Sequence, residues 1–287
     1  MKRMTQQAPA KVNLALDIRG RRPDGYHDMR MVMQTVSLCD AVTVEEAEQG
    51  FALHTDGDFI PAGKKTLEQQ AAEAFFAAIG RSMPGMSVTL EKRTPAYAGL
   101  GGGSADVAAL LRILRDAYCP EMSCEELERI GFSVGSDMPF CVRGGTALAE
   151  GRGELLTDLR PLPDCFFVLC KPDFGIPTPS LFALVDGGEL KRRPDIGGMA
   201  AALEAGDLDG AAARLGNVFE DILPPEYREV FAIKGRLLEL GALNAAMSGS
   251  GPTVFGVFRQ RQAAEQAARA LKEDYVQTFL AEPVKKF

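Results

Sequence analysis

A glycine-rich stretch at residues 95–106 is the part of this chain best suited to holding an anionic ligand. It reads Pro-Ala-Tyr-Ala-Gly-Leu-Gly-Gly-Gly-Ser-Ala-Asp, and four of the five residues from Gly99 to Gly103 are glycine. Glycine adopts positive φ and lets the backbone approach a ligand closely. Amides at a helix N-terminus, at the positive end of the helix dipole, bind anions. The stretch therefore predicts a cradle for phosphate groups, although a surface turn would also use glycine.

The stretch does not match the two best-known phosphate motifs. A Walker loop has Lys and then Ser or Thr after its last glycine, whereas Gly103 is followed by Ser104 and Ala105. A dinucleotide-binding fingerprint needs a third glycine at its sixth position. Counted from Gly99 that position is Ser104, and counted from Gly101 it is Asp106.

Three further segments carry residues that could act on a substrate. Lys11 and Asn13 share one face of a predicted strand and could contact an anion there, or form part of a solvated face. Asp137, in Gly-Ser-Asp-Met-Pro-Phe at 135–140, could accept or orient a hydroxyl proton, or form an Asx turn before a strand. Met-Ser-Gly-Ser-Gly-Pro-Thr at 247–253 could approach a ligand closely, or only join a helix to a strand.

Regular elements must position these segments. Alternating apolar residues predict a strand before the glycines, and apolar residues at helical spacing after them predict a helix with Ser104 as its cap and Asp106 in its first turn. The predicted strands are 11–18, 31–37, 41–46, 87–92, 146–149, 165–170 and 253–258. The predicted helices are 66–79, 104–118, 125–130, 199–205, 207–215, 226–240 and 261–273. Strands and helices interleaved without regular spacing indicate the α+β class, with a domain boundary near the loop-like residues 157–164.

Composition narrows the class of protein. The chain has 287 residues, 46% hydrophobic and 25% charged, which is typical of one large or two ordinary globular domains. A net charge of −7 argues against general binding to nucleic acid or anionic membranes. No apolar run approaches the ~18 residues of a membrane span, and residues 1–10 show no signal segment, so the cytoplasm is the expected location.

Cysteine and histidine usage limits the metal and redox chemistry. The six cysteines lack Cys-x-x-Cys spacing and are interpreted mainly as buried reduced thiols. His27 and His54 are the two histidines of the chain, too few to favour a zinc site. A serine–histidine–carboxylate triad is disfavoured too, because the chain has no Gly-x-Ser-x-Gly elbow.

The ordered segments together resemble the motifs of the GHMP small-molecule kinases, nearly end to end. These are Pro-Ala-Lys-Val-Asn-Leu at 9–14, the glycine stretch at 95–106, and the segments at 135–140 and 247–253. The resemblance implies an α+β, two-domain GHMP kinase fold. Residues 1–158 would form an N-terminal ribosomal-protein-like β-α domain with the ATP loop, and residues 159–287 a C-terminal ferredoxin-like α/β sandwich.

Other segments resemble family members that phosphorylate a cytidine-diphosphate-linked methylerythritol in non-mevalonate isoprenoid biosynthesis. They are Arg-Arg-Pro-Asp-Gly-Tyr-His at 21–27, Met-Gln-Thr-Val-Ser-Leu at 33–38 and Gly-Ile-Pro-Thr-Pro at 175–179. The implied partner is a small-molecule substrate, with no nucleic acid and no membrane, and the implied assembly is a monomer or weak homodimer.

The resemblance also implies roles for individual residues. Lys11 and Asp137 would be the catalytic pair, Asp137 taking or orienting the hydroxyl proton while Lys11 lowers the pKa of that carboxyl and stabilises charge on the transferred phosphoryl group. ATP would be held by Pro95, Ala96, Tyr97, Ala98, Gly99, Leu100, Gly101, Gly102, Gly103, Ser104 and Ala105, with Mg²⁺ carried by the ATP phosphates and contacted by Ser104. The cytidine substrate would be bound by Asn13, Tyr26, His27, Thr178 and Phe182, with Tyr26 and Phe182 sandwiching the cytosine ring and His27 bonding to its edge. Ser248, Gly249, Ser250 and Gly251 would form a secondary loop beside the site.

Three positions depart from the family pattern. Tyr97 is bulky where relatives usually carry a small residue, and Ala105 replaces a common serine. Lys65-Thr66-Leu67 stands where an Asp/Asn-Asn-Leu element usually opens a helix beside the adenine. Three alternatives remain open at this point. One is a GHMP kinase acting on homoserine, mevalonate or a sugar; another is a ligand-binding relative without catalysis; the third, disfavoured by the acidic charge, is a nucleic-acid-binding module.

Overall fold

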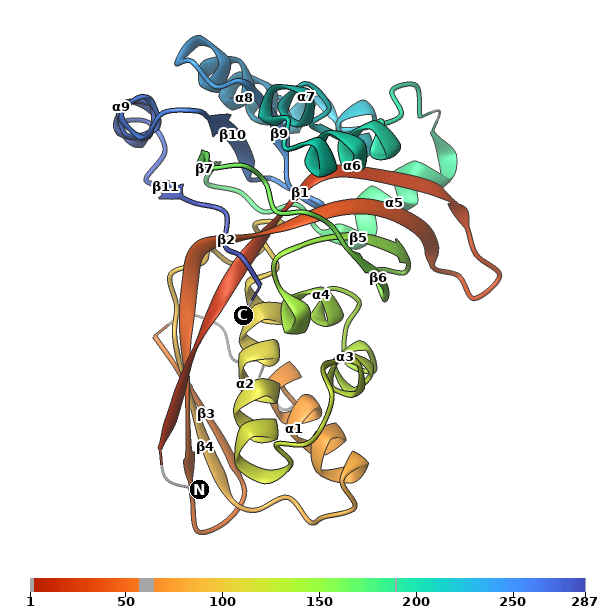
Figure 1. Ribbon diagram of the computed structural model, residues 1–287, viewed down its shortest axis with the longest axis vertical. Coiled ribbons are helices and arrows are strands. Elements are labelled where there is room, and N and C mark those ends of the chain that lie inside the picture. The colour runs from red at the N-terminus through yellow and green to blue at the C-terminus, as the bar shows by residue number, and fades with distance from the viewer. Residues whose placement is uncertain (1–2, 57–64, 189, 287) are drawn as a thin grey trace. The chain divides into compact units, whose positions relative to one another are not determined.

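The computed structural model describes residues 3–56, 65–188 and 190–286, and they form two compact units (Figure 1). Unit 1 comprises Met1–Ala10, Cys39–Thr94 and Gly101–Arg143, and unit 2 comprises Lys11–Leu38, Pro95–Leu100 and Gly144–Phe287. Two long strands, β1 (Met4–Arg21) and β2 (His27–Glu46), contribute residues to both units. The α+β class predicted from the sequence is confirmed.

Unit 1 consists of strands with helices on one side (Figure 1). The strand β4 (Met86–Glu91) lies between the second half of β2, to which it is antiparallel, and β3 (Phe51–Thr55), to which it is parallel. The helices are α1 (Leu67–Ala78), α2 (Gly102–Tyr118), α3 (Cys124–Phe132) and α4 (Met138–Arg143). Val44 and Val88, opposite each other in the sheet, are fully buried, as are the apolar residues that recur at helical spacing along α2.

Unit 2 contains two groups of strands. In the first, β5 (Thr146–Gly151) pairs with the first half of β2 and with β6 (Leu155–Asp158), while β1 pairs in parallel with the short β8 (Gly216–Asn217). The second is an antiparallel sheet of order β11-β7-β10-β9, made by β7 (Phe166–Lys171), β9 (Asn244–Met247), β10 (Val254–Phe258) and β11 (Gln277–Ala281). The helix α8 (Glu229–Glu239) packs on β9 and β10, and α9 (Arg261–Lys272) packs on β7 and β11. The remaining helices of unit 2 are α5 (Thr178–Gly187), α6 (Ile196–Ala205), α7 (Leu208–Ala213) and two 3₁₀ turns, Val218–Asp221 and Pro225–Tyr227.

Most predicted elements are present, but some local predictions are wrong. The strands predicted at 31–37 and 41–46 are one strand, β2, because no glycine or proline interrupts the chain between them. The helix α2 begins at Gly102, and its cap is Gly101, with φ 67° and no side-chain capping bond, so Ser104 lies inside the helix rather than at its cap. Asp137 is followed by the helix α4, so the alternative interpretation of Asp137 as an Asx turn before a strand is wrong about the strand.

The sequence also predicts a boundary at 158–159 between two domains, and that division stays a prediction. Several short elements were not predicted from the sequence, among them α5, β3, β8, β9 and β11.

All six cysteines are free thiols, and Cys141, Cys165 and Cys170 are buried as expected, while the other three are partly exposed. Among the helices of the described residues, none has the length and apolar character needed to cross a membrane.

Candidate active site

Lys11 and Asn13 lie next to each other on a buried face of β1 in unit 2. The Lys11 Nζ atom donates a hydrogen bond to Asn13 Oδ1 at 2.8 Å, and the two residues are only 4% and 1% exposed. The alternative of a solvated strand face is therefore wrong for these residues. Burial of an ammonium group is costly unless it is paired and hydrogen-bonded, so a buried lysine held in this way is suited to meeting an anionic ligand.

The first half of the glycine stretch and the 247–253 loop meet beside this pair. Ser248 Oγ donates to the Gly99 carbonyl oxygen at 2.9 Å and accepts from the backbone N–H of Asn13 at 3.3 Å. A Cβ atom on Gly99 would lie 2.1 Å from the Ser248 carbonyl oxygen, and one on Gly249, whose φ is +55°, would lie 3.2 Å from Lys11 Nζ. At Gly99 the two loops pack too closely for a side chain, and at Gly249 the left-handed φ favours glycine.

Two polar residues that the sequence analysis missed hold the 247–253 loop. The Asn217 side-chain amide donates to the carbonyl oxygens of Met247 and Gly249 at 2.8 and 2.7 Å. The Glu220 carboxylate accepts from the Met247 N–H at 2.9 Å and also pairs with Lys234. Both side chains are buried. In the sequence, the only sign of their role is that they flank the apolar pair Val218-Phe219.

The second half of the glycine stretch forms the N-terminus of α2 in unit 1. A Cβ on Gly102 would lie 3.0 Å from Thr94 Cγ2, whereas one on Gly103 would meet nothing within 4 Å. Gly103 is exposed, and the first N–H groups of a helix have no partner within the helix. The backbone from Gly102 to Ser104 therefore fits an anionic group such as a phosphate.

An ionic cluster that the sequence analysis missed lies beside this helix N-terminus. The Lys92 ammonium donates to the carboxylates of Asp40 and Asp106, and Asp40 also accepts from the backbone N–H groups of Arg93 and Thr94 at 2.6 and 2.7 Å. Burial raises the pKa of Asp106 to about 7, outweighing the attraction of Lys92. Burial alone would lower the pKa of Lys92, but the two carboxylates outweigh it and raise that pKa. The prediction of Asp106 in the first turn of the helix is wrong, because α2 begins at Gly102; Asp106 lies beyond that turn and is a buried partner of Lys92.

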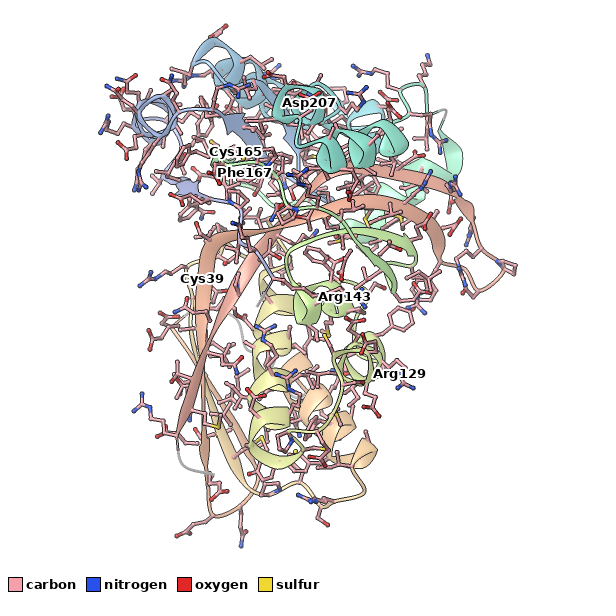
Figure 2. The ribbon with its side chains drawn as sticks, in the orientation of Figure 1. Cys39, Arg129, Arg143, Cys165, Phe167 and Asp207 are labelled. Atoms are coloured by element: carbon pink, nitrogen blue, oxygen red, sulfur yellow. The ribbon has the colours of Figure 1, made fainter. Side chains whose placement is uncertain are left out.

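Asp137 lies in unit 1, in the turn that leads into α4. Its carbonyl oxygen accepts from the Cys141 N–H at 3.1 Å, which begins the helix, and its side chain is partly exposed. The helix α4 ends at Arg143, which is labelled in Figure 2. The Arg143 guanidinium pairs with the carboxylate of Glu128, on α3, at 2.6 and 2.8 Å. A charged fork of this kind restrains the turn that carries Asp137.

The aromatic residues expected to bind cytosine lie in unit 2. The His27 ring stacks on Phe182, with centroids 4.7 Å apart and planes inclined by 25°. Tyr26 is 51% exposed, and the guanidinium of Arg152, a residue the sequence analysis missed, lies 3.5 Å from its ring centroid. Thr178 Oγ1 and Ser250 Oγ share a hydrogen bond of 2.7 Å, so the secondary loop reaches a predicted substrate contact.

The positions that depart from the family pattern also have structural roles. Tyr97 has φ 51°, a left-handed conformation that is unusual for a residue with a side chain, and it is 69% exposed. Thr66 is the N-cap of α1, and its side chain accepts from the Gln69 N–H at 3.2 Å. Ala105 is buried in the first turn of α2.

Comparison with known proteins adds family and fold. The family model described as "GHMP kinases N terminal domain" matches residues 66–145, and "GHMP kinases C terminal" matches residues 199–277. A protein of Clostridium botulinum (strain Kyoto / Type A2) named 4-diphosphocytidyl-2-C-methyl-D-erythritol kinase is 37% identical over 98% of this chain and 100% of its own length. The protein of the same name from Clostridium tetani is 38% identical over the same shares.

Solved structures give the same picture. The crystal structure of a 4-(cytidine 5'-diphospho)-2C-methyl-D-erythritol kinase matches with a TM-score of 0.81 and 34% identity, covering 98% of this chain and 99% of that one. A homoserine kinase from Cytophaga hutchinsonii matches with a TM-score of 0.72 at 18% identity, over 100% and 96% of the two chains, which indicates a shared fold.

Proposed function

The chain belongs to the GHMP kinase family, and from that membership we propose that it is an ATP-dependent kinase that phosphorylates the 2-hydroxyl of 4-diphosphocytidyl-2-C-methyl-D-erythritol. The reaction is a step toward isopentenyl diphosphate in the non-mevalonate pathway. The observation that carries the proposal is the identity of 37% over the full length of a relative bearing that kinase's name. The proposal includes the cytoplasm as location and a monomer or weak homodimer as the working form.

Lys11 and Asp137 are the proposed catalytic pair. The 2-hydroxyl oxygen forms a bond to the γ-phosphorus of ATP, the bond from that phosphorus to the β–γ bridging oxygen breaks, and ADP leaves. Asp137 accepts or orients the hydroxyl proton, and the Lys11 ammonium stabilises the negative charge of the transferred group. The buried hydrogen bond from Lys11 to Asn13 supports this role because it fixes the direction of the ammonium.

The proposed ATP-binding segment is the glycine stretch from Pro95 to Ala105. The open space at Gly103 and the exposed backbone at the start of α2 support it, since an added side chain would fill the place where phosphate oxygens would meet the N–H groups. Mg²⁺ bound with the nucleotide would neutralise phosphate charge, and the Ser104 hydroxyl is the side chain proposed to contact it. Phosphoryl transfer depends mainly on positioning and electrostatics, so few side chains suffice.

The proposed cytidine site comprises Asn13, Tyr26, His27, Thr178 and Phe182. Aromatic faces stack on bases with little loss of side-chain freedom. The exposed ring of Tyr26 and the packed rings of His27 and Phe182, all within unit 2, support this assignment.

A substrate panel tests the proposed function. The purified protein is incubated with ATP and, separately, 4-diphosphocytidyl-2-C-methyl-D-erythritol, homoserine, mevalonate and a hexose, and ADP release is measured. Turnover with the cytidine compound is expected. Turnover with another acceptor alone would replace the substrate, and turnover with none would favour a non-catalytic relative.

A further inference from the structure

His27, at the start of β2, is held on two sides within unit 2. Its Nε2 atom lies 2.8 Å from Oδ1 of Asp186, on α5, and its side chain is only 8% exposed. One face of its ring stacks on Phe182, which in turn meets Phe219 edge-on at 5.2 Å. The imidazole therefore has one orientation, set by a carboxylate and an aromatic ring.

The contact with Asp186 also fixes which ring nitrogen carries a proton. An ionised carboxylate accepts hydrogen bonds and has none to donate, so the proton of the neutral ring must lie on Nε2. The other nitrogen, Nδ1, then carries a lone pair and can only accept a hydrogen bond. The partner of one ring nitrogen thus decides what the other can bind.

This fixed acceptor distinguishes two pyrimidines at their 4-position. Cytosine carries an amino group at this position, which donates a hydrogen bond. Uracil, like thymine, carries a carbonyl oxygen there, which accepts one. We propose that Asp186 is a positioning residue that holds His27 with Nδ1 as an acceptor for the 4-amino group, and so makes the site select cytosine over uracil. This inference rests on the proposed function, in which His27 bonds to the base edge.

Helix stability and ion pairing do not account for Asp186. It lies in the last turn of α5, where the helix dipole disfavours negative charge. Its other partner is Arg21, at 3.4 Å, and the two side chains are 32% and 63% exposed, so that ion pair contributes little to stability.

The tautomer can be measured directly because the chain has two histidines, His27 and His54. Nitrogen-15 NMR of the histidine-labelled protein gives two ring systems, and His54→Gln assigns them. At a pH where the ring is neutral, His27 is expected with its proton on Nε2 alone. In Asp186→Leu a mixture of tautomers is expected. A proton on Nδ1 in the unsubstituted protein would overturn the proposal.

Nucleotide selectivity gives the second measurement. The dissociation constants of CDP and UDP are compared by calorimetry, and a preference of roughly tenfold or more for CDP is expected, because a mismatched acceptor pair leaves polar groups unsatisfied. In Asp186→Leu the preference should fall below about threefold, mainly through weaker CDP binding. Asp186→Asn keeps an acceptor oxygen and should retain part of the preference. The matched control Arg21→Gln removes the ion pair but keeps the carboxylate, and its ratio should equal that of the unsubstituted protein.

Failure of the inference and failure of the proposed function give different results. A purely structural Asp186 would make Asp186→Leu weaken CDP and UDP by the same factor, which would overturn the inference even if the cytidine substrate is phosphorylated. Absence of phosphorylation with a CDP preference that depends on Asp186 would overturn the proposed reaction alone.

Discussion

The Nζ atom of Lys11 donates a 2.8 Å hydrogen bond to Oδ1 of Asn13, its neighbour on the same face of β1. This bond joins two side chains that the sequence predicted as a pair, and it lies beside Gly249, where a Cβ atom would come within 3.2 Å of Lys11 Nζ and 3.4 Å of Asn13 Oδ1. The Asn13 amide oxygen thus restrains the position of the buried Lys11 ammonium.

Lys11→Ala is expected to reduce kcat by about a hundredfold or more, because a preorganised charge on the transferred phosphoryl group is lost. Steady-state kinetics measure this, and circular dichroism checks the fold. Lys171→Ala is the matched control, since Lys171 is also a buried lysine of unit 2, with Nζ donating to the Pro172 carbonyl oxygen at 3.0 Å. The control should change stability but leave kcat near that of the unsubstituted enzyme. Near-normal turnover in Lys11→Ala would refute its assignment.

Asp137→Ala and Asp137→Asn are both expected to reduce kcat by roughly 10²- to 10⁴-fold, because neither side chain can take the hydroxyl proton. The amide keeps the size and most of the hydrogen bonding of the carboxylate, so a loss in Asp137→Asn isolates the charge. Single-turnover kinetics with saturating ATP measure the chemical step. Ser136→Ala, at the preceding position, controls for disturbance of the turn. A normal rate in Asp137→Asn would show that the carboxylate is not needed.

Tyr26→Ala should raise the KM for the cytidine substrate by roughly tenfold or more and leave that for ATP nearly unchanged, because stacking on a base contributes ~1–3 kcal/mol. Tyr26→Phe retains the ring and should behave like the unsubstituted enzyme. Equal KM values in Tyr26→Ala and in the original protein would exclude stacking on this ring, one face of which already meets Arg152.

Two glycines of the same stretch should respond oppositely to substitution by alanine. Gly103→Ala introduces a Cβ that meets nothing within 4 Å in a helical position, so the free energy of unfolding should stay the same or rise by up to about 1 kcal/mol. Its KM for ATP should nevertheless rise, because the side chain projects where phosphates are proposed to bind. Gly99→Ala, with its Cβ 2.1 Å from a carbonyl oxygen and φ +74°, should destabilise the protein by several kcal/mol. Urea denaturation and ATP titration separate the two effects, and unchanged ATP binding in Gly103→Ala would contradict the proposed cradle.

Asp106 predicts a pH dependence of stability. Its pKa is raised by burial from 3.8 to about 7, so between these values the folded protein binds a proton that the unfolded chain has released. Stability from this group is full below the lower value and is lost as pH rises toward the upper one. Asp106→Asn should remove a slope of about 1 kcal/mol per pH unit across that window, measured by urea denaturation. The same urea denaturation measurements over pH on Asp116→Asn separate the loss of the Asp106 slope from a general effect of removing a negative charge from α2. An unchanged slope in Asp106→Asn would contradict the shifted pKa.

The sequence predicted what depends on near neighbours along the chain. The strand before the glycines and the helix α2 after them follow from apolar spacing within short windows, and both are present. The cap of α2 was predicted wrongly because Ser104 has the right side chain, whereas Gly101 has the backbone freedom that the turn needs.

Contacts across long stretches of sequence could not be predicted from spacing. Ser248 meets Gly99 across 149 positions, and His27 meets Asp186 across 159. Lys92 is the last residue of the predicted strand 87–92, and its two carboxylate partners, Asp40 and Asp106, lie 52 and 14 positions away. The periodicity of apolar residues predicts which face of a helix or strand a residue occupies, but it does not predict which distant residue will contact that face.

The passage of β1 and β2 through both units has a consequence for how such a chain can be altered by recombination. Each unit is assembled from three separate stretches of sequence, and the change of unit within β1 falls between Ala10 and Lys11. A single crossover between Lys11 and Arg143 therefore gives both units residues from both parents. A junction inside β1 would join strand halves from different parents next to Lys11. Hybrids that fold and function should therefore have their junctions in loops outside Met4–Arg21 and His27–Glu46.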